Sequence, residues 1–475
     1  MGELIDFTKN VNQALNDLQL RRNLQSAMSS LRLKRQAVFP NPEELEQLRR
    51  LGNAIRQRSL SQLPTLLEQL EQRCTANGIQ VHWAETTAEA NQIFLEIIHR
   101  HQATRVIKGK SMVSEEMHLN HFLEEHGIEV METDLGEYII QLDQETPSHI
   151  IVPAIHKNKE QIARLFHEKI PDTPYTEVVE ELNAIARQTL RQKFFAGEIG
   201  VSGVNFAVAE TGTLCLVENE GNGRMCTTVP PVHIAVMGLE KVVEKLADVP
   251  PLLRLLTGSA TGQLLTTYFN MITSPRQPGE KDGPQEVHLV ILDNGRSKIL
   301  ADPELRQTLQ CIRCGACLNH CPVYTRLGGH AYGYVYPGPI GAILTPQLEG
   351  LDQAGVIATA SSLCGACEEV CPVKIPFTQL LRRLRNESYA TEDSPQAVKG
   401  HGYKNNLLET LAWQGWAAMN TQPLLNAVGT KMLGILGSYL PKVGPLKHWT
   451  RIRTAPQFAR KSLHQLAREK GLDDE

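Results

Sequence analysis

The sequence contains no run of about 18 consecutive apolar residues, the usual minimum for a membrane-spanning helix. Its 48 lysines and arginines are outnumbered by 52 aspartates and glutamates, which leaves no excess of positive charge for a nucleic-acid surface. The first ten residues, MGELIDFTKN, lack the basic and apolar segments of a secretory signal. These absences predict a soluble, cytoplasmic protein whose membrane contact is at most peripheral.

Two common nucleotide-binding patterns are also missing. Residues 108–111 (KGKS) do not have the spacing of a P-loop, and Gly221 and Gly223 do not continue into the dinucleotide pattern G-x-G-x-x-G. A self-contained nicotinamide dehydrogenase is therefore disfavoured. The segment KGKS ends a predicted strand and precedes a predicted helix, so its backbone amides remain candidates for binding an anion.

The length and hydrophobic pattern predict several folded parts. At roughly 150 residues per domain, 475 residues correspond to about three domains, and 41% hydrophobic residues are enough for packed cores. Short apolar runs alternate with amphipathic helices between residues 76 and 298, which predicts an α/β domain with a largely parallel sheet. We expect a helical arm over residues 1–75, a cysteine-rich module over 299–393 and a helical C-terminal region over 394–475.

The same patterns place individual elements. Strands are predicted at 79–83, 105–108, 128–132, 149–153, 232–237 and 287–292. Helices are predicted at 42–74 with a break near Pro64, and at 87–99, 114–126, 157–168, 177–195, 405–420 and 425–440. Residues 203–217 predict a hairpin that turns at Glu210–Thr213.

Cysteine is the unusual feature of the composition. Seven of the ten cysteines lie between Cys311 and Cys371, and the other three are Cys74, Cys215 and Cys226. In a reducing compartment, clustered thiols indicate metal ligands rather than disulfides. Zinc fits poorly, because it needs four ligands, usually in two close pairs.

Two related motifs account for the seven thiols. The first is CIRCGACLNHCP at 311–322, and the second is SSLCGACEEVCP at 361–372, in which Ser361 replaces the opening thiol. Three thiols at intervals of three suit one iron–sulfur cubane, and in two-cluster modules the fourth thiol, before proline, ligates the other cluster. The first predicted ligand set is Cys311, Cys314, Cys317 and Cys371. The second is Cys321, Cys364 and Cys367.

The second set lacks one ligand. It suits a [4Fe–4S] cluster with Ser361, water or a partner's residue on the fourth iron, a [3Fe–4S] cluster, or a cubane completed by a distant thiol such as Cys226. We expect a four-iron cluster with a non-standard fourth ligand, for which Ser361 is the candidate.

Several polar residues beside glycines are candidates for ligand binding in the α/β domain, because parallel sheets bind ligands at the ends of their strands. These candidates are Lys108, Lys110, Asp134, Glu137, Glu210, Thr211 and Arg224. Turn formation and helix capping are the alternative roles. The glycine- and tyrosine-rich segment 328–341 is expected to pack over the clusters. The apolar segment 424–440 is expected to pack on the cluster module or on another subunit.

The sequence resembles the lactate utilisation protein B family over nearly its whole length. The resemblance is carried by KGKSMVSEEMHLN at 108–120, TDLGEYIIQL at 133–142, residues 205–224 and the two cysteine motifs, including the serine at 361. It implies an α/β domain of the sugar-isomerase and CoA-transferase-like (NagB/RpiA) type, followed by an α-helical ferredoxin-like two-cluster module. It also implies two companions, a cysteine-rich protein A and a protein C that shares the α/β domain.

The resemblance implies a function in oxidising L-lactate to pyruvate, in which this chain is the iron–sulfur electron-transfer component. No catalytic residue is predicted. The alternative is a self-contained hydroxy- or amino-acid dehydrogenase with its own nucleotide cofactor. A third hypothesis is a scaffold or sensor whose labile cluster reports oxygen or iron.

Overall fold

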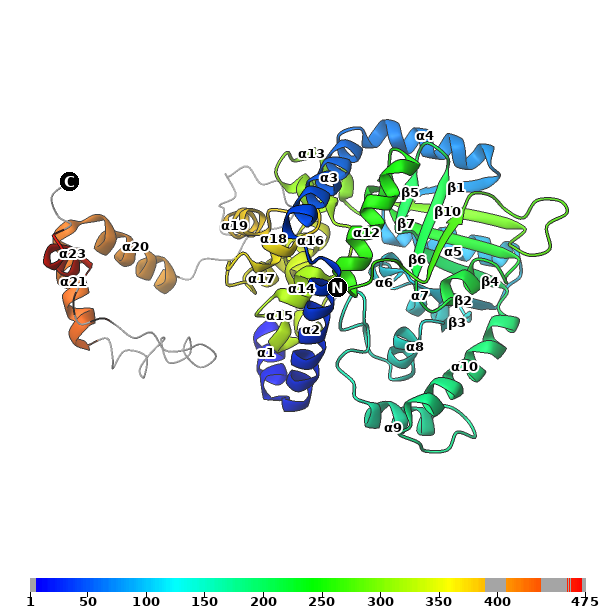
Figure 1. Ribbon diagram of the computed structural model, residues 1–475, viewed down its shortest axis with the longest axis horizontal. Coiled ribbons are helices and arrows are strands. Elements are labelled where there is room, and N and C mark those ends of the chain that lie inside the picture. The colour runs from blue at the N-terminus through cyan, green and yellow to red at the C-terminus, as the bar shows by residue number, and fades with distance from the viewer. Residues whose placement is uncertain (1–5, 389–406, 437–458, 460, 462, 472–475) are drawn as a thin grey trace. The chain divides into compact units, whose positions relative to one another are not determined.

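The computed structural model describes residues 6–388, 407–436, 459, 461 and 463–471 (Figure 1). The chain forms two compact units, Met1–Gly402 and Tyr403–Glu475. The first unit contains an α/β domain and the cysteine-rich module. The predicted boundary at residue 393/394 lies outside the described residues.

A six-stranded parallel sheet forms the centre of the α/β domain. Its strand order is β1-β10-β7-β4-β2-β3. The strands are β1 (Ile79–Ala84), β2 (Arg105–Gly109), β3 (Glu129–Glu132), β4 (Ile199–Gly203), β7 (Val232–Gly238) and β10 (Glu286–Leu292). The parallel sheet expected from the alternating pattern is therefore confirmed.

Both faces of the sheet are buried, which explains its continuous apolar strands. In β10, Val290 and Leu292 pack with the helices α5 (Thr87–Arg100), α6 (Met112–Glu116) and α7 (Leu119–Glu125). The alternate residues Val287, Leu289 and Ile291 belong to the core on the opposite face. The sheet therefore lies between two packed layers.

A smaller sheet has the strand order β8-β5-β6-β9. Its strands are β5 (Phe206–Val208), β6 (Thr213–Glu218), β8 (Val242–Val243) and β9 (Tyr268–Ile272). Strands β5 and β6 are antiparallel, which confirms the predicted hairpin, and its turn contains Gly212 at φ +67°. A left-handed φ of this kind favours glycine.

Helices complete the α/β domain. They are α8 (Leu135–Leu142), α9 (Lys159–Lys169), α10 (Val179–Ala196), α11 (Asn222–Cys226), α12 (Val249–Ala260) and α13 (Arg296–Ala301), with single turns η1 (Leu239–Lys241) and η2 (Leu246–Asp248). The segment 274–285 forms no helix or strand.

Two predicted elements are wrong. Residues 149–153 do not form a strand, because His149 Nδ1 accepts hydrogen bonds from the backbone N–H groups of Ile151 and Val152 and folds the segment locally. The predicted helix at 114–126 is two helices, α6 and α7. Between them, His118 adopts φ +51°, a left-handed conformation that interrupts an α-helix.

The cysteine-rich module is helical. Its elements are η3 (Leu305–Gln310), α14 (Ala316–His320), α15 (Tyr324–Leu327), η4 (His330–Tyr332), α16 (Gly338–Glu349), α17 (Leu351–Ala358), α18 (Ala366–Val370) and α19 (Phe377–Ser388). Helices α14 and α18, one from each cysteine motif, pack against each other. Tyr332 and Tyr336 are buried, as expected for a segment that covers the module.

The N-terminal helices bind the two parts together. They are α1 (Phe7–Asn16), α2 (Leu18–Val38), α3 (Pro42–Ser61) and α4 (Leu63–Ala76). Helix α2 packs on α14 and α15, and its Leu24 and Met28 are fully buried. Helix α4 packs on β1 and β8 instead. The predicted helical arm is therefore part of the first unit's core.

In the second unit, the described helices are α20 (Leu407–Thr421), α21 (Pro423–Leu436) and α23 (Leu463–Glu469). Within the part of the chain that the structure describes, we find no helix with the length and apolar content needed to cross a membrane. The packing expected for residues 424–440 stays a prediction, and its last four residues lie outside the described part.

Candidate functional site

The two cysteine motifs have the same backbone conformation. Arg313 and Leu363 hold equivalent places and adopt φ +60° and +55°, and Gly315 and Gly365 follow at +72° and +81°. Each glycine directly precedes a five-residue helix, α14 or α18. The sequence duplication is therefore also a structural duplication.

The structure brings the four cysteines of the first predicted set together. A small internal cavity of about 20 Å³ is lined by Cys311, Cys314, Cys317 and Cys371. Apolar residues surround the thiols, among them Ile150, Ile312, Ile340, Val373, Ile375 and Phe377. Cys371 comes from the second motif, as the crossing-over arrangement requires.

The second predicted set also lies together. Besides burial, the nearby Cys321 and Cys364 raise the pKa of the Cys367 thiol. Cys367 in turn adds to the effect of burial in raising the pKa of Cys317, which belongs to the first set. Cys364 is exposed, whereas Cys321 and Cys367 are buried. Ser361 is half-buried. This set therefore has one side open at the surface.

The residues around the thiols fit iron–sulfur clusters. The backbone N–H groups of Arg313, Tyr324 and Ile375 donate to the sulfurs of Cys311, Cys321 and Cys371 at 3.3, 3.5 and 3.4 Å. Bonds of this kind support cluster sulfur ligands. All described cysteines are free thiols, and four of them line one void, so they are available as metal ligands.

Burial keeps these thiols protonated when no metal is bound. It raises the pKa of Cys371 to about 11 and that of Cys367 to about 12, and it raises the pKa values of Cys314 and Cys317 as well. Thiolate ligation must therefore release protons, and cluster binding is coupled to pH and to folding.

The remaining cysteines lie elsewhere. Cys226 is buried in the core between α8–α10 and the sheet, where its sulfur lies 3.3 Å from Thr133 Oγ1. This position does not support its role as a distant ligand of the second set. Cys74 contacts the carbonyl oxygen of Gly212 at 3.5 Å, and Cys215 is buried in β6.

Arginines from the N-terminal helices contact the second cysteine motif. Arg35 Nη2 donates to the carbonyl oxygen of Val370 at 3.3 Å, and Arg49 Nε donates to that of Cys371 at 2.9 Å. Arg35 also acts electrostatically on Cys314 and Cys371. Helices α2 and α3 therefore place positive charge beside the thiols of the first set.

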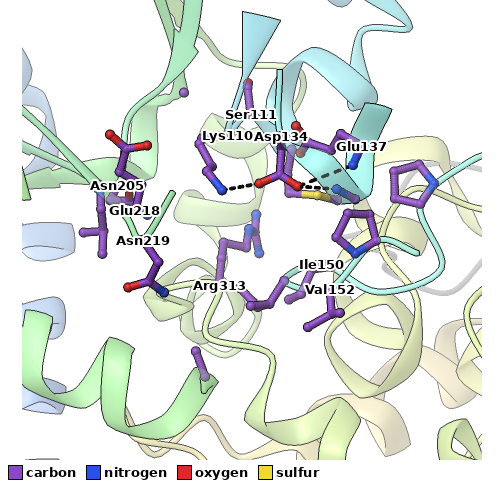
Figure 2. Close-up of a pocket in the computed structure, with 18 of the residues that line it drawn as sticks. Lys110, Ser111, Asp134, Glu137, Ile150, Val152, Asn205, Glu218, Asn219 and Arg313 are labelled. Carbon is purple, nitrogen blue, oxygen red and sulfur yellow. Dashed lines mark hydrogen bonds and ion pairs between the residues drawn. The ribbon is translucent and has the colours of Figure 1, made fainter. Parts of the chain in front are cut away.

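A second, larger cavity of about 510 Å³ adjoins the cysteines. Ile150 lines both this cavity and the small one among the four thiols. The larger cavity lies at the carboxyl ends of the parallel strands, and Arg313 and Tyr336 from the cysteine-rich module also line it. Figure 2 shows Arg313 beside the cavity. Open α/β sheets bind ligands at this edge.

Three of the predicted ligand-binding residues line this cavity. Lys110 pairs with Asp134 (Figure 2) and, at 2.6 Å, with Glu220. Burial alone would lower the pKa of Lys110, but the two carboxylates raise it. Glu137 also faces the cavity, and burial and its acidic neighbours Glu132 and Asp134 raise its pKa well above the usual value.

The other four predicted residues do not line the cavity. Lys108 is buried and pairs with Glu115 at 2.6 Å and with Glu132 at 2.8 Å. Glu210 Oε2 accepts the backbone N–H of Leu246. Thr211 bonds with Thr213 at the hairpin turn, and the backbone N–H of Arg224 donates to Glu218. Their interactions are those of structural residues.

The cavity contains residues that sequence reasoning missed. Lys241, in η1 after β7, is only 7% exposed and lines the cavity together with His149 and Glu218. Burial, with Arg313 nearby, lowers the pKa of Lys241 to about 8. Nothing in the local sequence singles out this lysine. It reaches the cavity because the sheet order places the carboxyl end of β7 beside that of β4.

A buried ionic network joins the cavity wall to the core. Arg296 binds Glu116 at 2.7 Å and Glu240 at 2.8 Å, and Arg313 binds Glu240 at 3.1 Å. Tyr336 OH donates to Glu116 at 2.8 Å, and Arg313 stacks over the Tyr336 ring at 4.7 Å. Burial would raise the pKa of Glu240, but the two arginines lower it to about 2.

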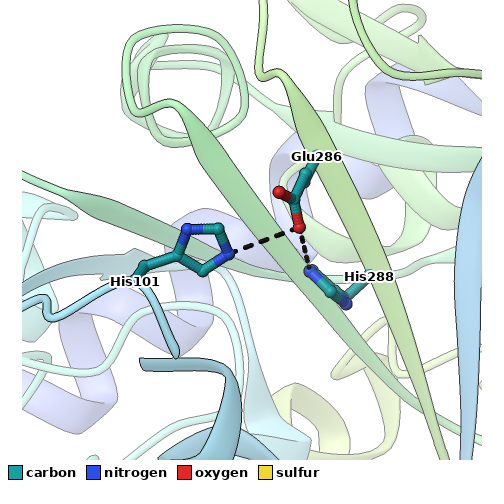
Figure 3. Close-up of side chains that lie close together, drawn as sticks. All are labelled: His101, Glu286 and His288. Carbon is teal, nitrogen blue, oxygen red and sulfur yellow. Dashed lines mark ion pairs between the residues drawn. The ribbon is translucent and has the colours of Figure 1, made fainter. Parts of the chain in front are cut away.

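A separate cluster lies at the opposite edge of the sheet. His101 Nε2 and His288 Nε2 lie 3.3 and 3.4 Å from Glu286 Oε2 (Figure 3). His82 Nε2 contacts the other ring nitrogen of His288 at 3.0 Å. The three ligand atoms lie within 4.8 Å of one another, so the geometry is compatible with a cation as well as with ion pairing. This cluster is remote from the cysteines, because it lies where the parallel strands begin.

Two sets of thiols beside an α/β domain define an iron–sulfur protein. The model of the 4Fe-4S dicluster domain matches residues 307–375 and spans both motifs. The LUD domain model matches residues 67–292, and the model described as "Lactate utilisation protein B, C-terminal" matches residues 383–472.

The chain belongs to the lactate utilisation protein B family. It is 43% identical over 462 residues to "Lactate utilization protein B" of Shouchella clausii, covering 96% of this chain and 94% of that protein. The protein of the same name from Bacillus licheniformis is 44% identical over 458 residues, 95% of this chain and 94% of that protein. "Uncharacterized electron transport protein YkgF" of Escherichia coli is 46% identical over 409 residues, 84% of this chain and 85% of that protein.

A solved structure, a DUF162 family protein from Deinococcus radiodurans, aligns with 48% of this chain and 98% of that chain. Its sequence identity is 14% and its TM-score is 0.27. This likeness is too weak to define the fold.

Proposed function

We propose that this chain is the iron–sulfur electron-transfer component of a system that oxidises L-lactate to pyruvate. The observation that carries the proposal is the convergence of Cys311, Cys314, Cys317 and Cys371 on one cavity, next to a second group of thiols. When bound, iron–sulfur clusters supply one-electron transfer at a potential set by their ligands and surroundings. The names of the relatives support lactate as the substrate of the system.

The ligand assignment is part of the proposal. The first cluster would be held by Cys311, Cys314, Cys317 and Cys371. The second would be held by Cys321, Cys364 and Cys367, with Ser361 at the fourth corner. Apolar side chains line the first set, whereas exposed Cys364 leaves the second set accessible to a partner.

The partners and boundaries also belong to the proposal. The companions would be the cysteine-rich protein A and the LUD-domain protein C of the same system, and the exposed side of the second set is where we place their contact. The boundaries at residues 75/76, 298/299 and 393/394 stay predictions, as does a cytoplasmic location. So does the likeness of the α/β domain to the sugar-isomerase and CoA-transferase-like superfamily.

Anaerobic purification of the full chain tests the proposal directly. Iron and acid-labile sulfide would be counted, and electron paramagnetic resonance spectra would be recorded with dithionite, with L-lactate, and with L-lactate plus the two companion proteins. We expect lactate to reduce the clusters only when the companions are present. Reduction by lactate alone would favour the self-contained dehydrogenase, and iron-free protein from an iron-supplied host would refute the proposal.

A matched pair of variants separates ligands from packing cysteines. Cys314→Ser should remove about one cluster's worth of iron and lower the thermal stability of the module, because cluster binding and folding are coupled. Cys215→Ala changes a buried cysteine in β6 and should keep the full iron content. Equal iron in both variants would contradict the assignment.

A further inference from the structure

The large cavity contains a buried positive charge without a counter-ion. Lys241 is 7% exposed and lines the cavity, and among the described residues its ammonium has no hydrogen-bond or ion-pair partner. The charged groups that act on it are Arg313, Arg56, Glu240 and the Cys311 thiol. An uncompensated buried charge is costly, so the site favours a bound anion.

The neighbouring carboxylate does not neutralise Lys241. Glu240 is already bound by Arg296 at 2.8 Å and by Arg313 at 3.1 Å. Lys110, which also lines the cavity, is likewise paired with Asp134 and Glu220. Among the cavity-lining cations that the structure describes, Lys241 is therefore the one without an ion-pair partner, and it can bind a ligand's negative charge.

The rest of the cavity suits a small organic acid with polar substituents. Asn205, Asn219, Gln263 and Thr261 line the cavity with amide and hydroxyl groups, and Ile150 and Val152 line it with apolar side chains. Figure 2 shows Asn205, Asn219, Ile150 and Val152 around the cavity. The cavity volume of 510 Å³ exceeds that of a three-carbon acid, so a longer acid also fits. Glu137 Oε2 is buried and has no hydrogen-bond partner among the described residues, so this carboxyl group, when protonated, can donate a hydrogen bond to an oxygen of the ligand.

The cavity's position would place such a ligand next to the first set of thiols. Ile150 lines both the large cavity and the thiol-lined cavity, so the two cavities adjoin at this residue. Arg313 belongs to the cavity wall and lies between Cys311 and Cys314 in the chain.

We propose that this cavity binds a 2-hydroxy or 2-oxo carboxylate, with Lys241 as the counter-ion of its carboxylate group. The choice of this acid class rests on the proposed function, whereas the anion site rests on Lys241 alone. The chain would then hold the acid beside its first cluster rather than only relay electrons from a partner.

Binding of pyruvate to the full-length chain with reconstituted clusters tests this inference, because pyruvate cannot reduce the clusters and binding is measured without turnover. Isothermal titration calorimetry should show binding of pyruvate and of L-lactate, and no binding of lactamide, which lacks the carboxylate. Lys241→Met should weaken pyruvate binding at least tenfold. The matched control Lys245→Met removes an exposed lysine four residues later and should leave affinity within twofold.

A second variant keeps the test decisive if Lys241→Met does not fold. Ala260→Leu adds bulk to the cavity wall at the end of α12 without changing charge, and it should also weaken pyruvate binding. Lys241→Arg should retain most of the affinity.

Three results would overturn the inference. They are no pyruvate binding to the wild-type chain, equal binding of lactamide, or a Lys241→Met variant that binds normally but shifts the cluster reduction potential. The last result would mean that Lys241 serves only to balance the cluster's charge. Iron and sulfide are counted on the same preparations. A chain that carries its clusters but does not bind pyruvate would contradict this inference and leave the proposed function standing.

Discussion

The hydroxyl of Ser361 accepts a hydrogen bond from the backbone N–H of Leu363 at 3.1 Å. At the equivalent place in the first motif, the Cys311 sulfur accepts the N–H of Arg313 at 3.3 Å. Ser361 therefore holds the same place in the second motif that Cys311, a proposed ligand, holds in the first. We infer that its oxygen faces the open corner of the second site.

Replacing this serine by cysteine should complete the second ligand set. In Ser361→Cys, a thiolate would bind iron more firmly than a serine hydroxyl, and the second cluster should lose iron in air several-fold more slowly. Loss of visible absorbance and of iron over time would measure this. Ser362→Cys places a thiol on the neighbouring exposed residue and should behave like the wild type. Equal rates in both variants would place Ser361 away from the corner.

The buried network around Glu240 should be important for stability. Glu240→Gln leaves Arg296 and Arg313 without their shared carboxylate, and removing one partner of a buried ionic network costs about 3–5 kcal/mol. Glu244→Gln, which breaks a more exposed pair with Arg58, should cost about 0–1 kcal/mol. Urea denaturation of both variants under anaerobic conditions would compare them. Similar losses would show that the network is unimportant.

Stability should fall in mild acid because several histidines are buried in the neutral form. Burial lowers the pKa of His233 to about 3 and those of His149 and His288 to about 4. The unfolded chain takes up these protons near pH 6.5, so the stability is present above that pH and is lost as the pH falls toward 3–4. Each histidine contributes up to about 1.4 kcal/mol per pH unit in this window.

His233 offers a direct check of this pH effect. Its Nε2 lies 2.9 Å from Ser202 Oγ in the central sheet, away from the cysteines. In His233→Gln, the melting temperature should depend less on pH between 4 and 6.5 than in the wild type. His121→Gln changes an exposed histidine and should not alter the profile. An unchanged slope in His233→Gln would contradict the prediction.

Two helical glycines should respond oppositely to alanine. A Cβ at Gly341 in α16 would lie 1.6 Å from the carbonyl oxygen of Tyr336, so Gly341→Ala must displace the backbone beside the thiol cavity. This change should lower the free energy of unfolding by about 1–3 kcal/mol. At Gly355 in α17 the nearest atom is 3.7 Å away, and Gly355→Ala should stabilise by about 0.5–1 kcal/mol. Thermal melting and iron content would measure both effects. Equal melting temperatures for the two variants would contradict the close approach of Gly341 to Tyr336.

The sequence was sufficient for features that depend on local spacing. Cysteine intervals indicated an iron–sulfur module, and alternating apolar runs indicated a parallel sheet. Residues 149–153 show the limit of such patterns, because their apolar run favours a strand while the His149 side chain binds the backbone nearby. The sequence of this segment therefore favours both a strand and a local turn, and the tertiary packing decides which one forms.

The sequence by itself determined which thiols are available, how they are spaced and which segments form helices or strands. The tertiary structure decided that Lys241 and Ile150 meet at one cavity and that Ile150 also lines the thiol site. The physical reason is that strand order and domain packing bring distant segments together. No local pattern encodes which buried charge is left without a partner.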